Sequence, residues 1–198
     1  MHVIVPVQSG NKRTKRRRLL VAALIITVGF ILLINNPLLN RIWPHIKNHD
    51  VPPVTGLHPI VAAKQMTLIQ ETKKIGITIL ITDGFRSTVE QDALYRQGRS
   101  DKGQIVTTVQ GGDSYHNYGL AIDFALRTLK GKVVWDLKYD GNHNGKSDWM
   151  EVVAIAKRLG FTWGGDWKNF KDYPHLQMDF GYTIGELKRG ERPTDVKS

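Results

Sequence analysis

The chain has 198 residues, 41% of them apolar, and a formal net charge of +10 from 28 lysines and arginines against 18 aspartates and glutamates. This length and apolar content predict one folded domain in addition to whatever the N-terminus forms. The absence of cysteine excludes disulfides, thiolate zinc sites and lipid attachment to a thiol. Residues 1–18 hold six basic residues and no acidic one, directly before an apolar stretch. Charge placed in this way indicates membrane topology, so we expect no nucleic-acid partner.

The apolar stretch, residues 19–34, contains sixteen residues without a charge. As a helix it would span about 24 Å, slightly less than the roughly 30 Å of a bilayer core. We predict a cytoplasmic tail (1–18), a transmembrane anchor (19–36), a proline-containing linker (37–57) and a single-pass protein whose domain lies outside the cell. The alternative is a cleaved signal segment and a secreted domain, although no Ala-x-Ala site follows the apolar residues.

The predicted domain covers residues 58–190, and a C-terminal tail of residues 191–198 follows it. Apolar residues at three-residue steps, from Ile60 through Met66 to Thr72, predict a helix over residues 59–75. Ser87 or Thr88 is expected to cap a second helix that runs to about residue 97, with Glu90 in its first turn. We expect a third helix at 149–159, strands at 77–81, 120–126, 132–137 and 176–180, and a polar loop at 98–112 with a short strand at 105–109. Because these elements show no βαβ alternation, they favour an α+β fold with a small antiparallel sheet and flanking helices.

The residues with the clearest chemistry lie in the segment Ser-x-His-x-x-Gly-x-Ala-x-Asp, residues 114–123, and in Asp-x-x-His, residues 172–175. His116, Asp123 and His175 offer three ligands for a zinc ion whose fourth position stays open for water. Side chains alternate between the two faces of a strand, so Asp123 is expected opposite Ile122 and its apolar neighbours. Asp172 is a carboxylate of the kind that takes a proton from such a water.

These motifs resemble the zinc D-alanyl-D-alanine peptidase superfamily, the VanX- and VanY-like enzymes. Their context over residues 58–182, including Trp-Gly-Gly-Asp-Trp at 163–167, is similar to the branch of peptidoglycan L-alanyl-D-glutamate endopeptidases, which holds a bacillus cell-wall enzyme and phage endolysins. The resemblance implies a fold of the D-Ala-D-Ala peptidase and hedgehog type, a Zn²⁺ cofactor and a peptidoglycan stem peptide as substrate. It implies hydrolysis of the L-Ala–D-Glu bond by a protein that we expect to be a monomer.

The same resemblance suggests roles for two further residues, and the local sequence suggests one for a third. Arg86 would polarise the scissile carbonyl and stabilise the oxyanion, because a guanidinium cannot lose its charge; a structural ion pair with Asp83 or Glu90 is the alternative. Ser114 would bind substrate, or serve only as a turn-forming hydroxyl. Trp167, beside the Gly-Gly loop, would form a wall of the cleft.

A separate segment matches the calcium-loop pattern Asp-x-Asn-x-Asn-Gly-x5-Glu. The candidate calcium ligands are Asp140, Asn142, Asn144, Asp148 and Glu151. The helix that usually precedes such a loop is missing. In the alternative explanation Asp148 caps the next helix and Glu151 occupies its third position.

Several alternatives to the endopeptidase remain open. A D-Ala-D-Ala or D-Ala-D-Lac carboxypeptidase would share the metal site but needs a cleft closed by a carboxylate-binding wall. A non-haem iron oxygenase also uses two histidines and a carboxylate, but typically as His-x-Asp, whereas six residues separate His116 from Asp123 here. An inactive wall-binding module is the third alternative. For localisation we expect the cell membrane with an extracellular catalytic domain, or secretion to the cell wall.

Overall fold

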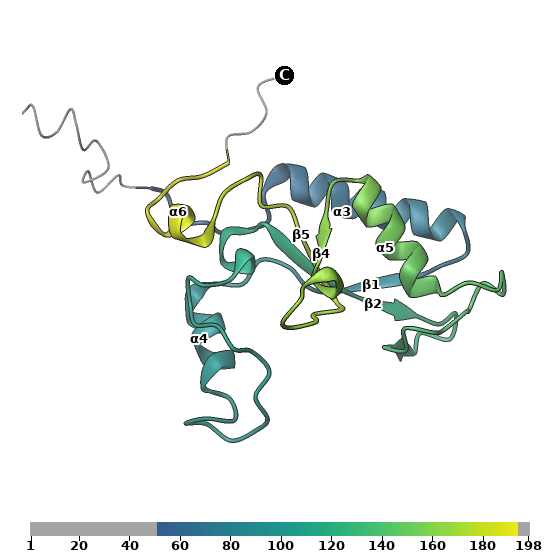
Figure 1. Ribbon diagram of the computed structural model, residues 1–198, viewed down its shortest axis with the longest axis horizontal. Coiled ribbons are helices and arrows are strands. Elements are labelled where there is room, and N and C mark those ends of the chain that lie inside the picture. Colours follow the sequence, from purple (N-terminus) through teal and green to yellow (C-terminus); the bar gives the residue numbers. More distant parts are fainter. Residues whose placement is uncertain (1–50, 194–198) are drawn as a thin grey trace, which may run out of the picture. The chain divides into compact units, whose positions relative to one another are not determined.

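The computed structural model describes residues 51–193 (Figure 1). The predicted cytoplasmic tail, the apolar segment, most of the linker and the last five residues lie outside this range. Within residues 51–193, no helix combines the length and the apolar character that crossing a membrane requires.

A small antiparallel sheet forms the centre of the domain. Its strands lie in the order β1 (Ile79–Asp83), β2 (Ala121–Arg127), β5 (His175–Gln177) and β4 (Thr162–Trp163), and β3 (Val133–Val134) pairs with the far end of β2. Every pairing is antiparallel. The predicted α+β fold with a small antiparallel sheet is therefore confirmed for the described residues.

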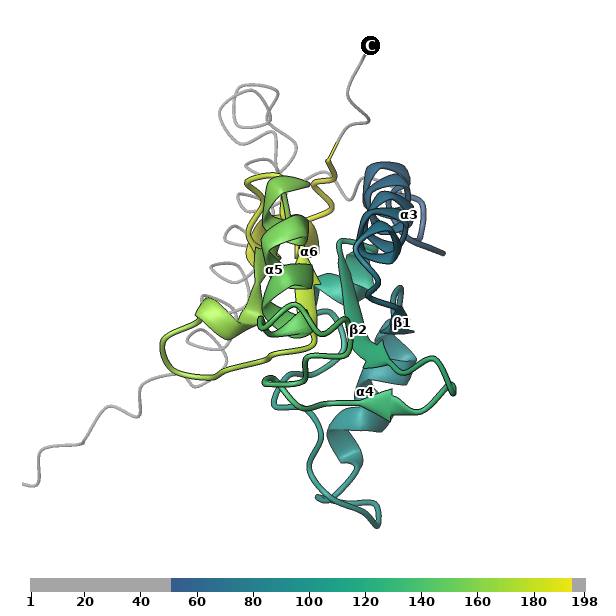
Figure 2. The same cartoon turned by 90° about the vertical axis from the view of Figure 1, so that its right-hand side faces the viewer.

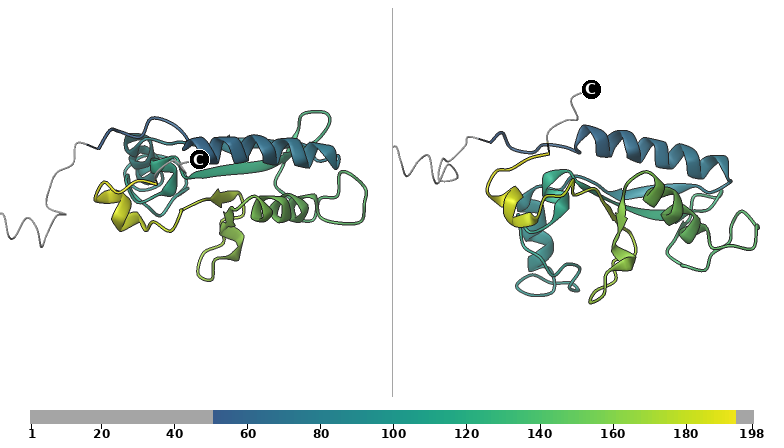
Figure 3. Two further views of the ribbon diagram at one scale, coloured as in Figure 1. Left: turned by 90° about the horizontal axis from the view of Figure 1, so that it is seen from above. Right: turned by 45° about the horizontal axis from the view of Figure 1, so that its top comes forward.

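Helices and site-bearing loops lie on opposite sides of this sheet. The helices α3 and α5 lie side by side over one face, and α4 and the loop after η3 project from the other (Figures 2 and 3). The helical elements are α3 (Pro59–Lys74), α4 (Thr88–Arg96), η2 (Tyr115–Tyr118), α5 (Asp148–Arg158), η3 (Gly164–Asp166) and α6 (Ile184–Lys188). This arrangement leaves one face of the sheet for the core and the other for a site.

The core lies between the sheet and the two covering helices. Ile122 and Phe124 of β2 are fully buried, and the Phe124 ring lies 4.7 Å from that of Trp149 in α5. Because side chains alternate along a strand, Asp123 must face away from this core, as the sequence predicted.

The helix over residues 59–75 was predicted correctly, but the three-residue steps that indicated it do not mark its buried face. Val61, Leu68 and Thr72 are fully buried, whereas Met66 is 53% exposed. A strict three-residue step turns only 300°, so the predicted stripe moves around the helix instead of staying on one side. The buried positions follow the true period, with steps of seven and four residues.

Other local predictions had mixed outcomes. Ser87 caps α4 in a reciprocal capping box with Glu90, as expected. Residues 105–109 form no strand. The last strand begins at His175 and is shorter than predicted. Ser147 rather than Asp148 caps α5, because its side chain accepts a hydrogen bond from the Met150 N–H. The helix-cap explanation of Asp148 is therefore wrong.

Candidate metal centre

Strand pairing brings two of the three predicted ligands together. Asp123 of β2 lies directly opposite His175 of β5, and on its other side Asp123 pairs with Asp83 of β1 after a β-bulge. His116 comes from η2, the short helix that precedes β2. Gly119 ends that helix in the left-handed conformation, with φ of 68°. A residue with a Cβ would be strained there, so the glycine lets the chain turn from the histidine into the strand.

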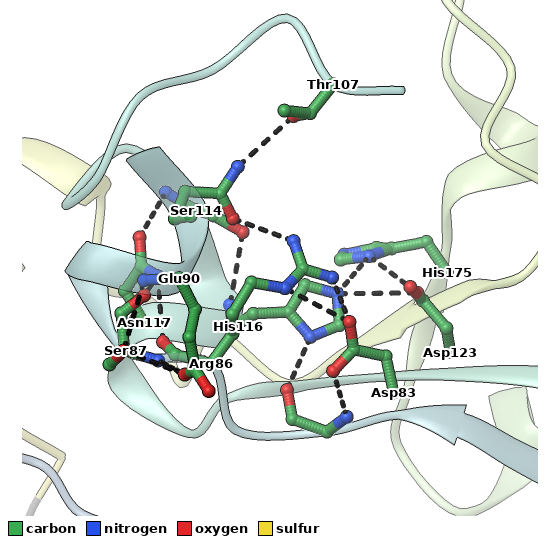
Figure 4. Close-up of polar contacts among 12 residues, drawn as sticks. Asp83, Arg86, Ser87, Glu90, Thr107, Ser114, His116, Asn117, Asp123 and His175 are labelled. Carbon is green, nitrogen blue, oxygen red and sulfur yellow. Dashed lines mark hydrogen bonds and ion pairs between the residues drawn. The ribbon is translucent and has the colours of Figure 1, made fainter. Parts of the chain in front are cut away.

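The three ligand atoms form a nearly equilateral triangle (Figure 4). The Nε2 of His116 lies 3.2 Å from the Nδ1 of His175, and both nitrogens lie 3.3 Å from the same carboxylate oxygen of Asp123. Donor atoms bound to tetrahedral zinc at about 2.0–2.1 Å are separated by about 3.3–3.4 Å. The triangle therefore has the dimensions of three corners of a zinc site.

The outward-facing nitrogen of each histidine is held by a neighbour. The Nδ1 of His116 lies 2.6 Å from the carbonyl oxygen of Gly84, and the Nε2 of His175 lies 3.0 Å from the Oε1 of Gln177. These acceptors place the protons on the outer nitrogens, so two nitrogen lone pairs face the triangle. The Oδ1 of Asp123 is buried without a hydrogen-bond partner. Three lone-pair donors that face one another without a proton are what a bound cation requires.

The electrostatics of the centre point the same way. Burial lowers the pKa of His116, but the neighbouring carboxylate of Asp123 outweighs burial, and the net pKa is raised. Burial raises the pKa of Asp123, but the two adjacent histidines outweigh burial and hold that pKa well below its usual range. Both shifts favour positive charge between the three side chains.

Asp172 lies in the same cleft as the three ligands, and the cleft has a volume of about 840 Å³. Its backbone N–H donates to the carbonyl oxygen of Gly164 at 3.2 Å, and its own carbonyl accepts from the N–H of His175 at 3.3 Å. A Cβ on Gly164 would lie 2.4 Å from the carbonyl oxygen of Asp172, so only glycine permits this approach. Burial and the negative charge of Asp123 raise the pKa of Asp172.

Arg86 also lines the cleft, and its side chain is 14% exposed. Its guanidinium forms an ion pair with Asp83, and its Nη1 donates to the Oε1 of Gln91 at 2.7 Å. Glu90 bonds to Ser87 instead. The ion pair with Asp83, which the sequence analysis gave as the alternative role, is therefore present. It does not exclude a role in the site, because Asp83 pairs with the ligand Asp123 across the two strands and so holds Arg86 near the ligands.

Two further predicted site residues, Ser114 and Trp167, also line the cleft. Ser114 caps η2, because its hydroxyl accepts from the N–H of His116, and it also lines the cleft. Trp167 is 36% exposed, lines the cleft and places its ring 5.2 Å from that of His175. The predicted wall position of Trp167 thus agrees with its placement.

The predicted calcium loop is closed by its own hydrogen bonds. Asp140 accepts from the backbone N–H groups of Asn144 and Gly145, and the amide of Asn144 donates to both carboxylate oxygens of Glu151. Asp148 is 3% exposed; one of its oxygens accepts from the Gly141 N–H, and the other is buried without a partner. Asn142 accepts from Asn144 and donates to Ile75. Within residues 51–193, only His116, Asp123 and His175 bring three potential metal ligands within 4.8 Å of one another.

The sequence reasoning missed the residues that support the ligands. Gln177 could have been found, because it stands two positions after His175 on a strand and so shares its face. The carbonyl of Gly84 and the buried amide of Gln91 carry no comparable signal, because their contacts join segments that are distant in the sequence.

Comparisons with known proteins show what this chain is similar to. Residues 107–178 match a family model described as D-alanyl-D-alanine carboxypeptidase. The chain is 55% identical over 156 residues to the peptidoglycan L-alanyl-D-glutamate endopeptidase CwlK of Bacillus subtilis (strain 168), which covers 78% of this chain and 93% of that protein. It is 37% identical over 124 residues to an L-alanyl-D-glutamate peptidase of Listeria phage A118, covering 62% of this chain and 38% of the phage protein. Among solved structures, the L-Ala D-Glu endopeptidase ChiX of Serratia marcescens aligns with a TM-score of 0.43 and 25% identity, over 63% of this chain and 82% of that one.

Proposed function

The chain belongs to the family of peptidoglycan L-alanyl-D-glutamate endopeptidases, and we propose that it hydrolyses the L-Ala–D-Glu bond of stem peptides at the centre formed by His116, Asp123 and His175. It is a zinc-dependent hydrolase of the D-alanyl-D-alanine peptidase superfamily. The observation that carries the proposal is the triangle of three potential ligand atoms, 3.2–3.3 Å apart, from residues that line the cleft.

The residues around this triangle match the requirements of peptide hydrolysis. When bound, zinc supplies a Lewis acid that activates water and polarises a carbonyl. Asp172 accepts the proton of the water that attacks the L-alanyl carbonyl carbon. It then delivers that proton to the D-glutamyl nitrogen as the C–N bond breaks. Arg86, fixed by Asp83, stabilises the oxyanion that forms on the carbonyl oxygen.

The charge of the cleft favours an endopeptidase over the carboxypeptidase alternative. Among the described residues that line the cleft, Arg86 is the only lysine or arginine, and Asp83 and Gln91 engage three of its five donors. A carboxypeptidase must bind the terminal carboxylate of its substrate, which calls for a further cation or a set of free donors. Arg86 cannot serve both that carboxylate and the oxyanion.

Removal of single ligands tests the proposed centre. We expect His116→Ala, Asp123→Ala and His175→Ala each to lose zinc and turnover, because each removes one of three protein ligands. His143→Asn is a matched control, since His143 is exposed and lies in the 140–151 loop. Zinc content by atomic emission and turnover of an L-Ala–D-Glu muropeptide are measured on all four. Full zinc in all three ligand variants would refute the assignment.

Residues 19–36 support a proposal on localisation. We propose that they anchor the protein in the cell membrane, with the peptidase domain outside and the basic tail inside, and that the enzyme acts as a monomer on peptidoglycan. Sixteen uncharged residues behind six basic ones support this orientation. Fractionation of the native host should find the protein in the membrane. Recovery from the medium of a mature form that begins near residue 40 would support secretion to the wall.

The loop from Asp140 to Glu151 is the second candidate for a cation site. We propose that it binds calcium, because one carboxylate oxygen of Asp148 is buried without a partner. Burial and the charges of Asp140 and Glu151 raise the pKa of Asp148, and a cation would relieve both costs. Calcium that binds only the folded protein adds about 2.7 kcal/mol at a hundredfold excess over Kd. A melting temperature equal in millimolar calcium and in a calcium-selective chelator would refute this proposal.

A further inference from the structure

Gln91 is a fully buried polar side chain that the proposed chemistry does not use. It lies in α4, on the side of that helix that faces the cleft loops. A buried primary amide carries one acceptor and two donor hydrogens, and leaving them unpaired is costly. Here all are engaged, which indicates that the surrounding structure is built around this side chain.

The partners of Gln91 belong to two different parts of the site. Its Oε1 accepts from the Nη1 of Arg86 at 2.7 Å. Its Nε2 donates to the Thr107 hydroxyl at 3.2 Å and to the carbonyl oxygen of Val109 at 2.9 Å. The dashed line that ends on Thr107 in Figure 4 is one of these bonds. A single side chain thus links the proposed oxyanion-stabilising arginine to the loop of residues 98–112.

That loop forms an apolar wall of the cleft. Ile105 and Val106 are 58% and 55% exposed, and both line the cleft, as do Trp167 and Phe170. The loop contains no helix or extended strand of its own. Arg99 donates to the carbonyl oxygen of Thr107, and Asp92 accepts from the Gly111 N–H. The two bonds from Gln91 are the ones that tie residues 107–109 to a buried side chain that also holds Arg86.

Arg86 depends on Gln91 as well. Asp83 binds the Nε side of the guanidinium, and Gln91 binds Nη1. Asp83 thus binds the guanidinium on its Nε and Nη2 edge, and Gln91 holds the remaining corner from a different element. Loss of the Gln91 bond should therefore misplace the charge that the oxyanion meets.

We propose that Gln91 is a positioning residue that fixes two parts of the site relative to each other. These parts are the guanidinium of Arg86 and residues 107–109 of the loop that lines the cleft. This inference rests on the proposed function. It predicts that the two ends of the amide group control different kinetic constants. The bond from Arg86 to Oε1 should govern kcat, because the oxyanion exists only in the transition state. The bonds from Nε2 to the loop should govern KM.

Two substitutions of similar size separate the effect of the bond to Arg86 from that of the bonds to the loop. Gln91→Glu keeps an oxygen for Arg86 but loses the donors to Thr107 and Val109. We expect KM to rise about tenfold while kcat stays within about threefold of wild type. Gln91→Met loses the bond to Arg86 and both bonds to the loop. We expect the same rise in KM together with a fall in kcat of about 10- to 100-fold. Thr107→Val removes one acceptor at the loop end without touching the buried amide, and it should raise KM alone.

Hydrogen–deuterium exchange of residues 98–112 gives a readout that does not depend on activity. Exchange there should become faster in Gln91→Glu, Gln91→Met and Thr107→Val, with zinc content unchanged. Gln70→Met on the exposed side of α3 is the matched control and should change neither exchange nor kinetics. If wild-type protein failed to cleave the muropeptide, the proposed function would fail, while the exchange result would still decide whether Gln91 holds the loop. Unchanged exchange, or equal kcat values in Gln91→Glu and Gln91→Met, would overturn the proposal. A lower melting temperature with wild-type kcat and KM would overturn it too.

Discussion

Replacement of Asp172 by asparagine separates proton transfer from metal binding. The backbone of residue 172 is held from both sides, by its N–H bond to Gly164 at 3.2 Å and by the bond that its carbonyl accepts from His175 at 3.3 Å. Asparagine has the same shape as aspartate, so these bonds and the loop should persist. An amide cannot accept a proton from water, so the expected loss is that of a general base.

The expected fall in kcat follows from the role of Asp172 as a general base. General-base catalysis contributes about 10²–10⁴-fold, which corresponds to about 2.7–5.4 kcal/mol in activation free energy. Asp172→Asn should therefore lower kcat by that factor, while zinc content stays at the wild-type level. Asp172→Glu should keep part of the activity, because the longer carboxylate still reaches into the cleft.

The assay compares turnover of an L-Ala–D-Glu muropeptide with zinc content for each purified variant. Asp166→Asn is the control, because Asp166 ends η3 just before the loop that carries Asp172, is 55% exposed and pairs with Lys157. It should retain full turnover. Full turnover by Asp172→Asn would show that another group is the base, and loss of zinc from this variant would make Asp172 a ligand.

Three further predictions concern the support of the site and the stability of the domain. Gln177→Leu should weaken zinc affinity about 10- to 100-fold, measured by competition with a chelator, because His175 loses the partner that fixes its tautomer. Gly119→Ala should lower the free energy of unfolding in urea by at least about 1–2 kcal/mol, since φ there is 68°. Hydrogen bonds from Ser87 hold the pKa of Glu90 below its ordinary value of 4.5, so this carboxylate stabilises the fold above that pH and loses its effect as the pH falls through the lowered pKa. The melting temperature of Glu90→Gln should therefore fall less than that of wild type between about pH 5 and pH 3.

The ligands of the metal centre could be predicted from the sequence because local rules place them. Strand alternation puts Asp123 opposite Ile122 and Phe124. The histidines come from η2, just before β2, and from the first position of β5. The capping box of α4 has an equally local signal, with Ser87 three residues before Glu90. Each of these features needs only a few neighbouring residues.

The features that were missed depend on contacts between distant segments. Residues 105–109 are all β-branched and suggested a strand, but Ile105 and Val106 line the cleft instead of pairing with the sheet. The support of His116 by Gly84 and of Arg86 by Gln91 arises only when β1, η2 and α4 meet. The sequence of any one segment therefore does not indicate these contacts.

The bond that is cleaved tests the central claim most directly. Purified residues 51–198 should be incubated with a muropeptide that carries a complete stem peptide, and the products identified by mass spectrometry. The account predicts that the new ends are the carboxyl group of L-alanine and the amino group of D-glutamate. Cleavage should stop when a chelator removes zinc and return when zinc is restored. Release of a terminal D-alanine instead, or undiminished cleavage by the zinc-free protein, would contradict the account.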